Sequence, residues 1–160
     1  MDTADLTRYM AEQGIDAEII FLEEMTPTVE TAAEAVGVRP QQIVKSLLFL
    51  LKGAEGELRP LLVVANGFSR VDYKKLAAYL DVSRRQVRIA RPEQVAAITG
   101  YHVGTVPPFG HRQPLFTLVD EGVMREEEVY AGGGAINALV RLETAELQRA
   151  LSAEIVPLTE

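Results

Sequence analysis

The chain has 160 residues, of which 48% are hydrophobic and 24% charged, and its formal net charge is −7. These proportions are those of a globular protein, so they exclude a disordered or fibrous chain, and the length predicts a single domain over residues 1–160. The sequence contains no cysteine, which excludes a disulfide framework, thiolate-bound zinc and a thiol nucleophile.

The apolar segments are too short for a bilayer, the longest being a strand-length run at 46–51. The N-terminus starts with acidic residues where a secretory signal would carry basic ones. We therefore expect a cytoplasmic protein that makes no contact with membranes.

The first half of the chain predicts helices and strands in turn. Gly14 and Gly37 are suited to end the first two helices, Thr28 to begin the second and Asp72 the third, and Pro40 to open a short helical turn. The predicted helices cover 5–13, 29–36 and 72–80, and the predicted strands cover 17–22, 43–51 and 61–65, the last two joined as a hairpin by a turn at 52–57.

The second half predicts mostly short strands around an irregular segment. Pro92 starts a helix that Gly100 ends, and Thr144 is expected to cap a final helix that reaches Leu151. Strands are predicted at 86–90, 115–119, 128–131 and 135–142, and the segment at 104–111 is too rich in proline and glycine for a regular element. Because the order lacks regular βαβ alternation, we expect an α+β domain around one curved sheet.

Lys45 is the first candidate functional residue, because it lies inside an otherwise apolar strand. A buried ammonium costs free energy unless it reaches water, a counter-charge or an anionic ligand. Lys45 can therefore either hold an anion or lie at the frayed start of the strand and extend into solvent.

Two glycine-containing segments are the next candidates. The segment 104–111 has a fixed backbone at its two prolines, and Gly104 and Gly110 permit close approaches, so it can present main-chain groups to a ligand or serve as a rigid connection. The glycines at 132–134 can aim amides at a phosphate or an oxyanion, or simply form a sharp bend. They match neither a P-loop nor a dinucleotide fingerprint.

Histidine and serine offer little else. His102 and His111 lack the spacing of a zinc hydrolase, so no metal is expected, and Ser69 lacks the glycine pattern of a nucleophile elbow. The stretch 70–91 has seven basic residues against two acidic ones. It could contact phosphates or be a solvated helix face.

Taken in order, these segments resemble the YbaK/prolyl-tRNA-synthetase-associated editing domain family. The resemblance runs from Thr26 to Leu142, and it rests on the residues at 28–38, 42–49, 72–77, 99–104, 108–110 and 132–134. The family hydrolyses the ester that joins a wrong amino acid to transfer RNA, typically the proline acceptor. The resemblance therefore implies a free-standing, trans-editing deacylase with a strongly bent mixed sheet, a YbaK-like barrel, and flanking helices.

The resemblance also assigns site residues. The family's strand lysine corresponds to Lys45, which is expected to hold the phosphate of the terminal adenosine or the developing oxyanion. Its Gly-x-x-x-Pro loop falls on Gly104 to Pro108. The residues expected to bind substrate are Thr28, Ser46, Gly104, Pro108, Phe109, Gly110, Gly132, Gly133 and Gly134.

The expected partners are the acceptor end of proline transfer RNA, contacted by Arg84, Arg85 and Arg88, and prolyl-tRNA synthetase. No cofactor is expected. Ser46 stands where many relatives have threonine, and Pro107 and the triple glycine also depart from the family pattern. We expect cysteine or alanine as the amino acid removed, although these departures leave the specificity open.

Two other functions stay open on the sequence alone. A relative of the same fold could bind transfer RNA or a synthetase without hydrolysis. A metal-dependent hydrolase of small esters or amides is the other alternative.

Overall fold

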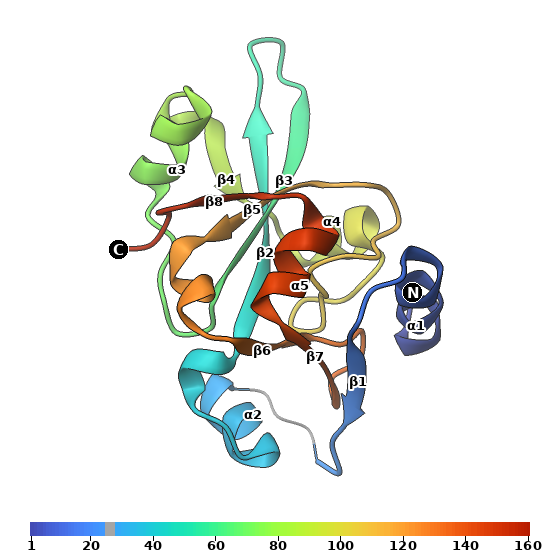
Figure 1. Ribbon diagram of the computed structural model, residues 1–160. Helices are drawn as coiled ribbons and strands as arrows, with labels where there is room; N and C mark the ends of the chain where they lie inside the picture. Colours follow the sequence, from blue (N-terminus) through green and yellow to red (C-terminus); the bar gives the residue numbers. More distant parts are fainter. Residues whose placement is uncertain (25–27) are drawn as a thin grey trace.

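The computed structural model describes residues 1–24 and 28–160, so Thr26, the start of the family resemblance, lies outside the described residues (Figure 1). Within the described part of the chain, one sheet has the strand order β4-β2-β3-β5-β8 and a second has the order β1-β7-β6. Their bounds are β1 (Glu18–Phe21), β2 (Val44–Lys52), β3 (Leu58–Asn66), β4 (Val87–Ile89), β5 (Phe116–Asp120), β6 (Glu128–Gly132), β7 (Ala138–Glu143) and β8 (Glu154–Val156).

The expected α+β class with mixed strand directions and flanking helices is confirmed, although the described residues form two sheets instead of one bent sheet and the barrel is not closed. An isolated bridge between Ile43 and Tyr130 joins the two sheets where β2 begins. A single bridge does not make the two sheets continuous, and they diverge from each other beyond it. The two sheets therefore meet at one corner, and that corner holds the candidate site.

The helices pack around the sheets, and their ends follow the expected chemistry. Asp2, Thr28 and Asp72 accept hydrogen bonds from backbone amides at the starts of α1, α2 and α3. Gly14 and Gly37 adopt left-handed conformations where α1 and α2 end. The helices are α1 (Thr3–Gln13), α2 (Val29–Val36), α3 (Tyr73–Leu80), α4 (Pro92–Thr99) and α5 (Thr144–Leu151), with short 3-10 turns at η1 (Pro40–Gln42), η2 (Arg84–Gln86) and η3 (Glu121–Arg125).

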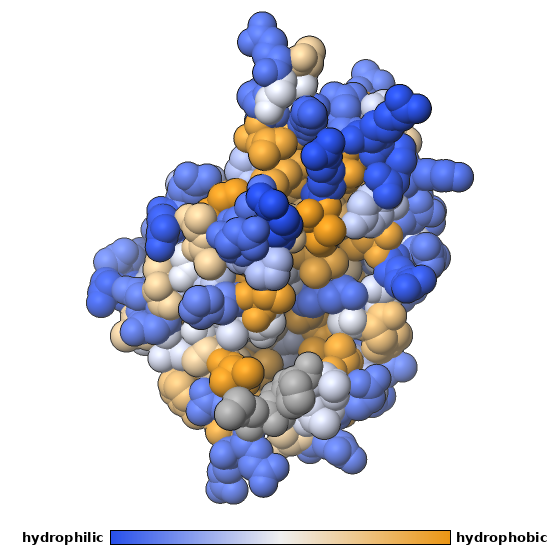
Figure 2. All heavy atoms as spheres, turned by 180° about the vertical axis from the view of Figure 1, so that it is seen from behind, coloured by the Kyte–Doolittle hydropathy of each residue, from blue (hydrophilic) through white to orange (hydrophobic). Residues whose placement is uncertain are grey.

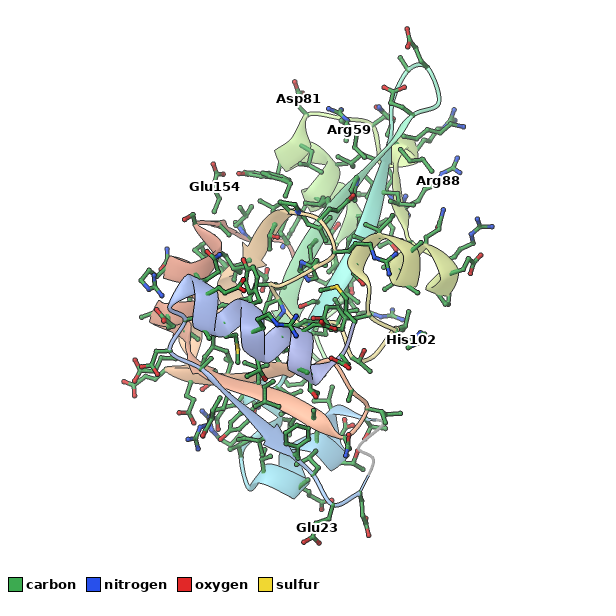
Figure 3. The ribbon with its side chains drawn as sticks, turned by 90° about the vertical axis from the view of Figure 1, so that its right-hand side faces the viewer. Glu23, Arg59, Asp81, Arg88, His102 and Glu154 are labelled. Carbon is green, nitrogen blue, oxygen red and sulfur yellow. The ribbon has the colours of Figure 1, made fainter. Side chains whose placement is uncertain are left out.

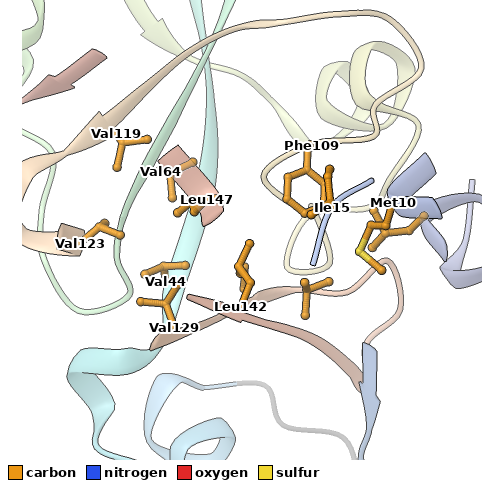
Figure 4. Packing of buried hydrophobic residues seen from close by; sticks show 13 residues of the cluster. Met10, Ile15, Val44, Val64, Phe109, Val119, Val123, Val129, Leu142 and Leu147 are labelled. Atoms are coloured by element: carbon orange, nitrogen blue, oxygen red, sulfur yellow. The ribbon is translucent and has the colours of Figure 1, made fainter. Parts of the chain in front are cut away.

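The β2–β3 hairpin separates two parts of the core. Its register runs from Val44 opposite Asn66 to Lys52 opposite Leu58. Alternation sends Val44 toward the cluster shown in Figure 4, and it sends Leu48 and Leu50, on the same face, toward a cluster that includes Tyr101. The other face, which includes Phe49, packs against α3. Lys45 lies on this second face, one position after the strand begins.

Several elements of the C-terminal half differ from expectation. β7 begins at Ala138 instead of residue 135, because the amide of Ala138 donates to the carbonyl of Ala135 and closes a turn. Thr144 does not cap α5, since its hydroxyl donates to the carbonyl of Glu126 at 2.7 Å. The short strand β8 was not expected, and it adds a parallel edge beside β5.

A buried aromatic contact fixes the proline-containing loop at 104–111. Phe109 lies in the core cluster (Figure 4). Its ring stacks on that of Tyr9 from α1 with centroids 6.0 Å apart. Burying a side chain of this size contributes about 1.5–3 kcal/mol relative to leaving it exposed. The N-terminal helix therefore anchors a loop that lies about 100 residues further along the chain.

Among the described residues, no helix combines the length and the hydrophobicity that crossing a membrane requires.

Candidate functional site

A small cavity of about 190 Å³ lies at the corner where the two sheets meet. It is enclosed by the start of α2, the start of β2, the loop at 104–106 and the ends of β6 and β7. Its lining residues are Thr28, Val29, Ala32, Ile43, Val44, Lys45, Ser46, Gly104, Val106, Gly132 and Leu139. The structure thus brings the predicted catalytic lysine together with Thr28, Ser46, Gly104 and Gly132.

Lys45 is half-buried at the edge of this cavity. Its ammonium donates a hydrogen bond to the carbonyl oxygen of Ser69 at 2.7 Å. Burial lowers the pKa of Lys45 below its usual 10.5, and the positive charge of Arg70 lowers it further. The side chain is therefore held at a fixed place, with a cation that lacks part of its hydration.

The hydroxyl groups of the cavity differ in their bonding. Thr28 Oγ1 accepts a hydrogen bond from the amide of Thr31, so this hydroxyl serves the start of α2. Ser46 Oγ is shielded from solvent and has no hydrogen-bond partner within residues 1–24 and 28–160. A buried hydroxyl without a partner costs about 1–3 kcal/mol, which a polar atom of a ligand would recover.

The triple glycine shapes the cavity by close packing. A side-chain carbon at Gly132 would collide with the carbonyl of Val106, and one at Gly133 would lie 2.7–2.8 Å from the backbone of Ala138 and Leu139. The amide of Gly133 donates to the carbonyl of Ala138 at 3.1 Å, and that of Gly134 to Thr105 at 2.9 Å. Both amides therefore donate to carbonyls of the protein itself, which is what a sharp bend requires.

Five predicted substrate-binding residues are not part of the cavity lining: Gly133 and Gly134, whose amides are bonded as described above, and Pro108, Phe109 and Gly110. Pro108 and Phe109 are buried, and Phe109 packs in the core. The carbonyl of Gly110 accepts a hydrogen bond from the Tyr101 hydroxyl at 3.2 Å. Nε2 of His111 lies 2.7 Å from the carbonyl of Pro107. In the structure these residues hold the loop in place, and only its start, Gly104 and Val106, reaches the cavity.

A larger groove of about 650 Å³ borders Lys45 on the α3 side, and we call it the basic groove. Its lining residues are Lys45, Leu47, Phe49, Arg70, Val71, Asp72, Tyr73, Lys74, Arg84, Ile89 and Glu160. The guanidinium of Arg84 lies 4.1 Å from the centre of the Tyr73 ring. Sequence reasoning found Arg70 and Lys74 only as part of a charged stretch, and nothing in the sequence indicated that the Ser69 carbonyl would hold Lys45.

The three arginines predicted to contact transfer RNA are divided between two hollows. Arg84 lines the basic groove, whereas Arg85 and Arg88 line a separate hollow of about 420 Å³ with Lys52. Figure 3 shows Arg88 pointing outward near the hairpin end of the molecule, with Glu23 at the opposite end.

No group of three or more potential metal ligands occurs in the part of the chain that the structure describes. His102 is exposed (Figure 3), and His111 is engaged with Pro107.

Comparisons with known proteins identify the family of the chain. The family model "Aminoacyl-tRNA editing domain" matches residues 23–150. The chain is 31% identical over 118 residues to a proline–tRNA ligase of Limosilactobacillus fermentum; the match covers 72% of this chain but spans only 20% of that ligase. It is 26% identical over 152 residues to the Escherichia coli multifunctional Ser/Thr-tRNA deacylase ProXp-y, covering 94% of this chain and 89% of the relative.

A solved structure agrees over the whole fold. A candidate trans-editing enzyme for prolyl-tRNA synthetase superimposes with a TM-score of 0.88 at 33% identity, covering 99% of this chain and 96% of the other. The family match includes the strand that carries Lys45 and the loop that reaches the cavity. The chain therefore belongs to the aminoacyl-tRNA editing domain family.

Proposed function

We propose that the protein is a trans-editing deacylase that hydrolyses the ester of mischarged proline transfer RNA and releases alanine or cysteine. The observation that carries the proposal is that one small cavity is lined both by Lys45, whose ammonium the Ser69 carbonyl holds in place, and by Ser46, whose hydroxyl has no partner among the described residues. The names of the relatives, a Ser/Thr-tRNA deacylase and a candidate trans-editing enzyme, support the reaction class.

An aminoacyl ester is already activated, so the reaction needs a positioned water and stabilisation of negative charge more than a strong nucleophile. The oxygen of water adds to the acyl carbon, and the carbonyl oxygen becomes an oxyanion. Collapse then breaks the bond between the acyl carbon and the ribose oxygen. One proton of the water ends on the ribose hydroxyl and the other on the released acid.

In this scheme Lys45 stabilises the oxyanion or a phosphate of the terminal nucleotide. Ser46 Oγ hydrogen-bonds the aminoacyl group, and backbone groups at the start of the loop orient the carbonyl. A hydroxyl of the ribose or the substrate amino group assists the water, so the reaction requires no protein base.

The cavity volume supports a small amino acid. About 190 Å³ lies below the roughly 300–1,000 Å³ of pockets that enclose drug-sized ligands. The lining is apolar at Val29, Val44, Val106 and Leu139. The aminoacyl group would enter the cavity, while the nucleotides of the acceptor end stay outside it.

The deciding experiment uses proline transfer RNA charged separately with alanine, cysteine, serine and proline. Wild-type protein should release alanine or cysteine faster than proline, at a rate above that of spontaneous hydrolysis. Failure to accelerate release from any of the four esters would overturn the proposal and leave a binding module of the same fold. An assay with a chelator tests the metal-dependent alternative, because the proposed mechanism predicts undiminished rates.

A protein partner and a cellular location follow from the same proposal. Prolyl-tRNA synthetase produces the mischarged substrate, so we propose it as a partner, and the reaction would take place in the cytoplasm where transfer RNA is charged. Pull-down of the synthetase with wild-type protein, in the presence and absence of transfer RNA, tests the partnership.

A further inference from the structure

The basic groove collects positive charge on an acidic protein. Lys45, Arg70, Lys74 and Arg84 line it, against the carboxylates of Asp72 and Glu160. None of the four cations forms an ion pair with another described residue, although arginines elsewhere do, for example Arg39 with Glu126 and Arg149 with Glu146.

The two acidic side chains in the groove offset only part of the charge of its four cations. An oxygen of Asp72 accepts hydrogen bonds from the amides of Lys74 and Lys75 at 2.9 and 3.3 Å. Arg70 is close enough to lower the pKa of Lys45 by repulsion. Like charges held together repel each other until an anion binds between them, so the groove is arranged for a negatively charged ligand.

Flat apolar surfaces lie beside the cations. The Tyr73 ring carries Arg84 on one face and meets the Phe49 ring edge-on, with centroids 5.4 Å apart. Ile89 is 48% exposed at the same groove. Figure 2 shows the molecule from behind, and strongly hydrophilic side chains gather at its upper right, over α3 and β4, next to an exposed apolar strip. Phe49 itself is buried, so the part-exposed Tyr73 ring and Ile89 are the apolar surfaces left for a base to contact. Cations beside apolar and aromatic surface are features of sites that bind single-stranded nucleic acid.

We propose that the basic groove binds the single-stranded 3′ end of the transfer RNA, with the phosphates next to the terminal adenosine contacting Arg70 and Lys74. Lys45 borders both the groove and the cavity, so a strand lying in the groove would deliver its terminal ester to the cavity. The proposal rests on the deacylase function and adds the route by which the substrate enters.

The test compares two double variants that each remove two positive charges. Arg70→Gln with Lys74→Gln alters the groove. Arg8→Gln with Arg125→Gln is the matched control, because both control arginines are exposed and line neither the groove nor the cavity. Equal thermal midpoints would show that both variants are folded. The substrates are alanyl-tRNA(Pro) and alanyl-adenosine, which lacks the phosphodiesters.

The groove variant should have a higher KM for alanyl-tRNA(Pro), whereas hydrolysis of alanyl-adenosine should stay within about twofold of wild type. Each phosphate contact to a single strand contributes about 0.7 to the slope of log affinity against log salt concentration, and the variant loses two such contacts. Between about 50 and 200 mM salt, the wild-type affinity should therefore fall roughly sevenfold more than the affinity of the variant. The control variant should behave as wild type with both esters.

Binding of the trinucleotide cytidylyl-cytidylyl-adenosine, measured by titration, separates the two proposals. Loss of this binding in the groove variant alone supports the route even if no ester is cleaved, whereas absence of cleavage by wild-type protein overturns only the deacylase function. Unchanged KM and trinucleotide affinity in the groove variant would overturn the route. So would equal affinity of wild type for AMP and the trinucleotide, because that result describes a mononucleotide site.

Discussion

The ammonium of Lys45 donates to the carbonyl oxygen of Ser69 at 2.7 Å, across 24 positions of sequence. The donor belongs to β2, and the acceptor lies in the turn that follows β3. Because the β2–β3 ladder pairs Lys45 with Ala65, the turn comes back over the lysine and fixes its side chain between the cavity and the basic groove. The first two of the following predictions depend on this placement.

Replacement of Lys45 with Ala should slow deacylation by about 10²–10³, the effect of removing one donor to an oxyanion. Lys75→Ala is the matched control, because Lys75 also donates to a backbone carbonyl at 2.7 Å, that of Thr159, but lines neither the cavity nor the groove. Single-turnover deacylation of the substrate found in the four-ester assay measures both. Equal rates in the two variants would remove Lys45 from the mechanism.

Activity should fall at high pH as the Lys45 ammonium loses its proton. Because the pKa of Lys45 is lowered by burial and by Arg70, the fall should occur below the 10.5 of a free lysine. Arg70→Gln removes the repulsive charge and should shift the fall to higher pH. Rates on alanyl-adenosine, corrected for spontaneous hydrolysis, give the profile; an identical profile in Arg70→Gln would contradict this assignment.

Ser46→Ala should separate function from stability. Removing a buried hydroxyl that has no partner leaves the free energy of unfolding unchanged or raises it by about 1 kcal/mol. The loss of a contact to the aminoacyl group should nevertheless lower kcat/KM. Denaturant unfolding and deacylation are measured on the same samples, with Ser69→Ala as the control, since that change keeps the carbonyl that Lys45 uses. A destabilised but fully active Ser46→Ala would show that the hydroxyl is structural.

Gly132→Ala should disturb the cavity directly. The new methyl group would collide with the Val106 carbonyl, and overpacking of this kind costs about 1–3 kcal/mol of stability. The loop should move away from β6, so deacylation should be impaired beyond the loss of folded protein. Gly14→Ala provides the comparison: it introduces a positive-φ strain in α1 with open space around it, and it should reduce stability while leaving the rate per folded molecule unchanged.

His111 should make stability depend on pH. Burial lowers its pKa below 6.5, partly opposed by the hydrogen bond to Pro107. A group that is held neutral in the folded state binds fewer protons than in the unfolded state, so stability is lost as pH falls through 6.5 toward the lowered pKa. His111→Gln should flatten the dependence of the unfolding free energy on pH between pH 7 and about 5. Denaturant unfolding at several pH values measures this dependence, and an unaltered slope in the variant would contradict the assignment.

Most of the local structure could be predicted from short patterns in the sequence. Apolar periodicity and capping residues predicted α2, α3 and the β2–β3 hairpin, because a helix start such as Asp72 or a helix end such as Gly37 acts within a few residues. The odd lysine in an apolar strand was also visible, as was the α+β class. Thr144 misled the prediction, since its hydroxyl found a distant carbonyl instead of its own helix.

The contacts of those residues depend on packing between segments that are distant in the sequence. Lys45 could have extended into solvent, but the turn at Ser69 holds it. Phe109 and Gly110 are predicted site residues whose packing against α1 places them outside the cavity. Whether two sheets close into a barrel or meet at a corner depends on contacts between segments as far apart as Ile43 and Tyr130. Such pairings are set by the packing of the whole core, which no short stretch of sequence specifies.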